Sequence, residues 1–97
     1  MAIIFNKTGR QVGQVESKTI LDSAGVRVGE VDGKHIYDAH GNKIGEVDGR
    51  YVYDQYGDRA GEFRGRLILD EFGEKVGEVD GGGKHELRGA AGLLLLM

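Results

Sequence analysis

The stretch GKHIYDAHGNKIGEVD, residues 33–48, is followed at once by GRYVYDQYGDRAGEFR, residues 49–64, and by GRLILDEFGEKVGEVD, residues 65–80. Two looser copies precede them, MAIIFNKTGRQVGQVE at 1–16 and SKTILDSAGVRVGEVD at 17–32. A unit of 16 residues is long enough for one β-hairpin but too short to bury a face by itself. Neighbouring copies must therefore supply each other's core.

Composition indicates one small domain and excludes several classes of function. The chain has 97 residues, of which 39% are hydrophobic, and its 13 basic and 16 acidic residues are spread evenly, for a net charge of −3. No basic stripe invites nucleic acid, and the absence of cysteine excludes disulfides and thiolate metal sites. The start, MAIIFNKTGR, has no charged region before its short apolar run, so we expect no secretory signal and favour the cytoplasm.

Each copy contains the signature of a type I turn. The ninth position of the repeat is glycine in all five copies, and the sixth reads Asn6, Asp22, Asp38, Asp54 and Asp70. In Asp-x-x-Gly the aspartate caps its own backbone and the glycine supplies a positive φ. The pattern predicts a three-residue hairpin loop closed by a glycine bulge.

A second turn lies between the copies. It is formed by Asp32-Gly33 and Asp48-Gly49, with Glu16-Ser17 and Arg64-Gly65 as weaker versions. Asp-Gly between alternating strands is a strong hairpin signal. Together the two turns predict about ten short antiparallel strands, and the first and last strands are left to meet and close a ring.

The spacing of apolar positions predicts an irregularity in the second strand of each copy. Positions four, twelve and fifteen are apolar throughout, and we expect the loop to place position four opposite position twelve and on the face of position fifteen. Twelve and fifteen are an odd number apart, so the strand period must slip between them, at the glycine of position thirteen. The predicted core contains Ile20, Ile36, Val52, Ile68, Val28, Ile44 and Val76.

The successive I-x-Y-D-x-x-G-x-x-I-G-x-V-D-G units, clearest from Gly33 to Gly81, resemble the four-fold β-flower domain, a bacterial family of splayed hairpins. The resemblance implies an all-β radial array of about four to five two-stranded antiparallel hairpins and no established activity. We expect a hairpin-repeat domain over residues 1–81, followed by a glycine-rich linker and apolar tail over 82–97. The stretch RYVYDQYGDRAG is also similar, more weakly, to the YD repeats of large bacterial surface proteins.

No catalytic, cofactor-binding or metal-ligating arrangement stands out. The aspartates of position six are spaced one per hairpin, unlike a dense calcium loop, and the three histidines are scattered. No Ser/His/Asp set and no cofactor fingerprint is present. We therefore expect no catalytic residues, no cofactor, no metal and no enzymatic activity.

Four tyrosines form one candidate binding surface: Tyr37, Tyr51, Tyr53 and Tyr56. If the aliphatic positions fill the core, the tyrosines of position five face outward, where an aromatic patch can bind a carbohydrate or cell-envelope polymer. Cross-strand packing under Lys43, Arg59 and Lys75 explains them nearly as well.

The chain ends in GAAGLLLLM, which is too short to span a bilayer. A free tail containing Leu93, Leu94, Leu95 and Leu96 would promote aggregation, so it must be buried. We expect residues 85–97 to form a short helix docked on the ring or on the same segment of another chain. The sequence thus favours a non-catalytic structural or protein-interaction module that self-associates through the tail, with polymer binding as the alternative.

Overall fold

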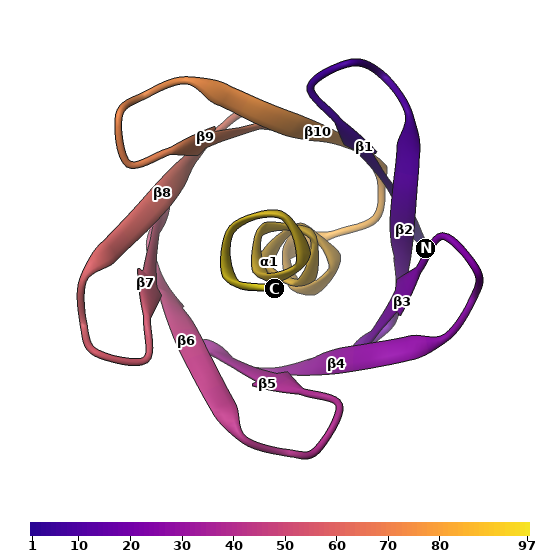
Figure 1. Cartoon of the computed structure of the whole chain (residues 1–97), viewed down its shortest axis with the longest axis horizontal. Coiled ribbons are helices and arrows are strands. Elements are labelled where there is room, and N and C mark those ends of the chain that lie inside the picture. The colour runs from indigo at the N-terminus through magenta and orange to yellow at the C-terminus, as the bar shows by residue number, and fades with distance from the viewer.

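A computed structural model describes all 97 residues as ten antiparallel strands followed by one helical segment. The molecule measures 29 × 29 × 19 Å. The strands are β1 (Ala2–Asn6), β2 (Gln11–Glu16), β3 (Thr19–Asp22), β4 (Arg27–Asp32), β5 (His35–Asp38), β6 (Lys43–Asp48), β7 (Tyr51–Asp54), β8 (Arg59–Arg64), β9 (Leu67–Asp70) and β10 (Lys75–Gly81). Each copy of the repeat forms one hairpin that splays from the ring like a petal (Figure 1).

The Asp-x-x-Gly turns form the petal tips. In the third copy the Asp38 carboxylate accepts hydrogen bonds from the backbone N–H groups of His40, at 2.9 Å, and Asn42, at 3.0 Å. Gly41 follows with a φ of 84°, which glycine adopts without steric cost. The predicted turn is confirmed in every copy, because equivalent bonds are made by Asn6, Asp22, Asp54 and Asp70.

The turns between copies are tight, but each lies one residue later than the predicted Asp-Gly pair. β4 ends at Asp32 and β5 begins at His35, so the central residues are Gly33 and Lys34. Gly33 has a φ of 60° and Lys34 has no positive φ, as in a type II′ turn. Ser17 takes the same role in the first such turn with a φ of 56°.

The predicted slip in strand period is a β-bulge. Ile36 pairs with Gly45 and Tyr37 pairs with Lys43, which leaves Ile44 as an extra residue in β6. The same shift occurs in all five petals. Two residues of the bulged strand then oppose one on its partner, so Ile44 packs against the core although it is three residues from buried Val47.

The predicted partner of position four is wrong. Position four lies opposite the glycine of position thirteen, not opposite position twelve, because the bulge takes the position-twelve residue out of the pairing. Val28, Ile44 and Val76 are consequently half-buried at the edge of the core. The predicted core residues of position four, by contrast, are fully buried: Ile20, Ile36, Val52 and Ile68.

The ring closes through β1 and β10, which pair antiparallel from Ala2↔Gly81 to Asn6↔Gly77. This closure was predicted, and the result is a closed barrel with no unpaired edge. The five copies make five petals (Figure 1), so the expected four-fold arrangement is corrected to a five-fold one.

The helical segment fills the axis of the ring (Figure 1). It consists of α1 (Lys84–Ala91) and the π-helical turn η1 (Gly92–Leu96). A Cβ atom added to Gly89 would lie 3.0 Å from Val15, and one added to Gly92 would lie 2.8 Å from Ile36. Only small residues fit between the helix and the strands at the centre of the ring, and Ala90 and Ala91 are fully buried there. The predicted tail helix is confirmed, and it docks on the ring of its own chain.

Candidate functional site

Each of the last five residues packs against one glycine of the ring. A Cβ atom added at position thirteen would lie 2.5–2.7 Å from a side-chain carbon of the tail in every copy. The pairs are Gly13–Leu93, Gly77–Leu94, Gly61–Leu95, Gly45–Leu96 and Gly29–Met97. Successive residues of the tail therefore reach successive petals. The side chains of the tail occupy the space that is left by the missing side chains of the glycines.

The π-helical turn explains how five consecutive residues reach five petals. Five equal petals are spaced about 72° apart, whereas successive residues of an α-helix with about 3.6 residues per turn are about 100° apart. The i→i+5 bonding of a π-helix widens the turn and reduces the rotation per residue. Changing from α1 to η1 at Gly92 therefore brings the helical rotation closer to that of the ring.

The petal end of the molecule carries an apolar surface. Leu93–Leu96 are half-buried there, and Met97 is 45% exposed. The petals add three exposed hydrophobic side chains, which are Val26, Tyr56 and Phe72. We call these three residues, with Leu93–Met97, the petal-end surface. It contains the four leucines that the sequence indicated for self-association, and their contacts in this chain are with its own ring.

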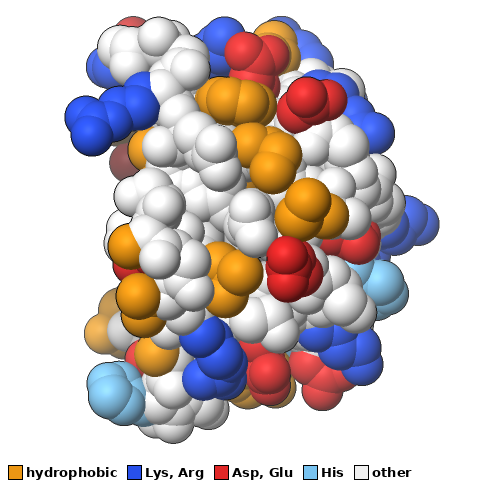
Figure 2. Space-filling model, turned by 90° about the vertical axis from the view of Figure 1, so that its right-hand side faces the viewer, with side chains coloured by type: hydrophobic (Ala, Val, Ile, Leu, Met, Phe, Trp, Pro, Cys, Tyr) orange, Lys and Arg blue, Asp and Glu red, His pale blue; other side chains and the backbone are white.

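The structure does not gather the four tyrosines into one patch. Tyr37 lies on β5, Tyr51 and Tyr53 lie on β7, and Tyr56 lies in the following petal turn. Tyr37 pairs with Glu30 and Tyr53 with Glu46, so a glutamate stands beside each ring on the outer wall. The wall built from β1–β3 has a similar mixture, with an oblique band of hydrophobic side chains between charged ones (Figure 2).

Tyr51 is the one of these tyrosines whose ring lies against two arginine side chains. The guanidinium carbons of Arg50 and Arg59 lie 5.4 Å and 5.3 Å from the centroid of its ring, within the range of cation–π attraction. Tyr53 pairs with Arg59 and Tyr37 with Lys43, as expected for packing under basic side chains. Neither of the two pockets on the surface is lined by a tyrosine, and polymer binding by these rings stays a prediction.

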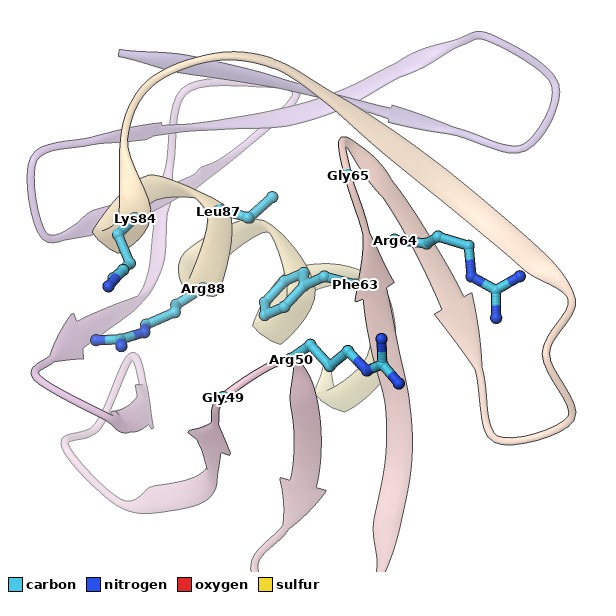
Figure 3. A pocket seen from close by; sticks show the side chains of 8 residues that line it. All are labelled: Gly49, Arg50, Phe63, Arg64, Gly65, Lys84, Leu87 and Arg88. Atoms are coloured by element: carbon cyan, nitrogen blue, oxygen red, sulfur yellow. The ribbon is translucent and has the colours of Figure 1, made fainter.

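A pocket of about 410 Å³ opens at the other end of the ring, beside the tight turns. Gly49 and Gly65 lie at two of these turns, and Phe63 and Leu87 give the pocket its apolar lining. The remaining lining side chains are all basic: Arg50, Arg64, Lys84 and Arg88. We call this site the basic pocket (Figure 3).

The basic pocket was not indicated by the sequence, because its charges come from separate parts of the chain: the turn before β7, the end of β8, and α1. The one local signal is Phe63, since the other four copies have valine at that position. The second pocket, of about 480 Å³, mixes Arg66 with Glu78 and Asp80, and Arg66 already donates to the backbone oxygen of Gly81 at 2.8 Å.

No group of three or more histidine, cysteine, aspartate or glutamate side chains is arranged to hold a metal ion. None of the helices is long and apolar enough to cross a lipid bilayer.

The chain matches a known protein family. A family model described as "5-fold beta-flower protein" matches residues 2–92, which includes all ten strands and α1. No curated protein and no solved structure matches the chain.

Proposed function

Because this chain belongs to the five-fold β-flower family, we propose that it is a non-catalytic structural module that binds a second copy of itself through the petal-end surface. The observation that carries the proposal is the concentration of apolar groups at that end. Half-buried leucines close the centre of the ring, and Val26, Tyr56 and Phe72 lie in the petal turns with 57%, 80% and 81% of their surface exposed.

Contact between two such ends would remove this apolar surface from water. Burial contributes about 25 cal/mol for each Å² of apolar area, and contiguous exposed apolar surface on a small protein commonly marks an interaction site. A two-fold pairing of identical surfaces is the commonest closed arrangement of identical chains. The petal turns are also held rigidly by their aspartate caps, so little ordering is needed on association.

Sedimentation velocity over a range of protein concentrations tests this function. We expect a concentration-dependent dimer for the wild type and a shift toward monomer for Phe72→Ser, which changes an exposed side chain of the surface. Leu67→Ser is the matched control, because Leu67 lies at the start of β9, next to a tight turn and away from the petal tips. A wild type that sediments as a monomer at every concentration contradicts the proposal, as does equal weakening by both variants.

A further inference from the structure

The basic pocket exists because the axial helix is not centred at the tight-turn end. α1 packs mainly against β1–β4, where Gly89 has no side chain to hold it away from Val15 and Val31. Nη1 of Arg88 also donates to the backbone oxygen of Gly33 at 2.9 Å, which fixes the helix to that side. The opposite side, next to β7 and β8, is left open.

The open side is lined by a larger apolar side chain than the other copies have at the same position of the repeat. Phe63 takes the place of the valine found in the other four copies, and its ring lies between the strand and Leu87 of α1 (Figure 3). Gly49 and Gly65 present no side chains over it. The volume of about 410 Å³ falls in the range of about 300–1,000 Å³ that is typical of sites for small organic molecules.

The charge of the pocket has one sign. Its four charged lining residues are all basic, although the whole chain has a net charge of −3. Two of them have partners: Arg88 bonds to Gly33, and Nε of Arg50 lies 3.8 Å from Glu62. The side chains of Arg64 and Lys84 make no hydrogen bond or ion pair within the chain, and both residues are exposed.

The basic side chains lie on both sides of the apolar lining. Lys84 and Arg88 extend to one side of Phe63, and Arg50 and Arg64 extend to the other (Figure 3). Long, exposed side chains of this kind can move toward a bound anion, and hydrogen bonds between charged partners are the stronger ones. A ligand that suits this arrangement has an apolar body over Phe63 and Leu87 and an anionic group at its edge.

We propose that the basic pocket binds a small organic anion, in which an apolar, aromatic-sized body carries a phosphate or carboxylate group. The apolar body lies against Phe63 and Leu87. The exposed side chains of Arg64 and Lys84, which extend from opposite sides of this lining, turn toward the anionic group and bind it. This site is at the opposite end of the ring from the petal-end surface, so it does not depend on self-association.

Binding of 1-naphthyl phosphate, followed by amide chemical shifts in NMR spectra, tests the proposal. We expect saturable shifts centred on the amides of Gly49 and Gly65, at two turns that border the pocket. Inorganic phosphate supplies the charge alone and 1-naphthol the apolar body alone, and each should bind at least about tenfold more weakly. Absence of shifts at these glycines, or equal binding of either fragment, overturns the proposal.

Charge variants locate the anionic group. Arg64→Gln and Lys84→Gln should each raise the dissociation constant of 1-naphthyl phosphate about tenfold, since each removes a charged hydrogen-bond donor. Lys7→Gln is the matched control, because it makes the same change in net charge on an exposed residue next to a petal tip. Equal affinity in Arg64→Gln, Lys84→Gln and wild type, or equal weakening by Lys7→Gln, contradicts the assignment.

Phe63→Val tests the apolar part, because it restores the residue that the other copies carry. Affinity for 1-naphthyl phosphate should fall severalfold, and affinity for inorganic phosphate should not change. Thermal melting of the variant verifies that the ring is still folded. Unchanged affinity for 1-naphthyl phosphate in a folded Phe63→Val protein overturns the role of the aromatic ring.

Discussion

A Cβ atom added to Gly61 would lie 2.7 Å from Cδ1 of Leu95, and it would also collide with the backbone oxygen of Leu69. The glycine of position thirteen is therefore a point where the strand, its neighbour and the axial helix meet. Its lack of a side chain is what lets the ring close around a leucine.

Gly61→Ala should destabilise the protein by about 2 kcal/mol, because overpacking of a close contact costs about 1–3 kcal/mol. For a chain of this size the melting temperature should fall by about 8–16 °C, measured by circular dichroism. Gly83→Ala is the control, since its Cβ would meet only Glu86, at 3.5 Å. A melting temperature of Gly61→Ala equal to that of Gly83→Ala would show that the ring adjusts freely at this position.

The double variant Gly61→Ala/Leu95→Ala separates the two obstacles to the added methyl group. The backbone oxygen of Leu69 cannot move without disturbing β9, whereas the leucine side chain can be removed. We expect the double variant to be no more stable than Gly61→Ala alone. Recovery of wild-type melting temperature would mean that the leucine was the only obstacle.

Deletion of residues 84–97 should abolish the cooperative thermal transition or lower its midpoint strongly. It removes the buried Ala90 and Ala91 and uncovers the inner faces of the strands, and burying one aliphatic side chain contributes about 1.5–3 kcal/mol. Circular dichroism and calorimetry measure the effect. A control deletion of Met97, which is 45% exposed, should change the midpoint much less. A ring that melts normally without residues 84–97 would rule out a structural role for the axial helix.

Ser17→Gly should stabilise the protein by about 1 kcal/mol. Ser17 is the only non-glycine residue with a positive φ, 56°. A left-handed conformation costs an L-residue about 1–2 kcal/mol, which glycine would not incur. Part of this gain is lost because glycine has a greater conformational entropy in the unfolded chain. Urea denaturation measures the change. Lys18→Gly in the same turn is the matched control, because Lys18 has no positive φ and should gain nothing. Greater stabilisation by the control would contradict this explanation.

Stability should decrease in acid through the petal turn that Asp38 caps. Hydrogen bonds from the backbone N–H of Asn42 and His40 lower the pKa of Asp38 below its ordinary value of 3.8, against a smaller desolvation effect. Because the folded pKa is the lower one, the stabilisation is complete above the unfolded value and is lost as pH falls through the folded value. Urea denaturation from pH 7 to below pH 3.8 should show this loss.

Asp38→Asn is the variant that isolates this effect. Asparagine already occupies the equivalent place in the first petal, where Asn6 accepts bonds from Thr8 and Arg10 at 3.0 Å. The variant should therefore fold normally and lose less stability in acid than the wild type does. An identical acid dependence in the two proteins would show that Asp38 does not contribute to it.

Local features of the fold could be predicted from the repeat alone. The caps by Asp38 and its equivalents, the positive φ of Gly41 and the bulge in β6 depend on a few neighbouring residues. Each was expected from spacing and turn chemistry, although the extra residue of the bulge is Ile44 and not the glycine that follows it. The family resemblance was confirmed as well, over residues 2–92. The candidate functional surfaces could not be predicted to the same degree, because the basic pocket combines Arg50, Arg64 and Lys84 from separate elements.

The sequence by itself determined the hairpins, their turns and the need to bury the leucine tail, because these follow from interactions within about one repeat. Only the tertiary structure decided that the ring has five petals, that Gly13 and its equivalents face the axis opposite position four, and that the tail enters its own ring. These three features depend on how the ring of hairpins closes around the tail. The number of petals and the width of the axial helix must fit each other, and that fit depends on contacts between residues as distant as Gly13 and Leu93.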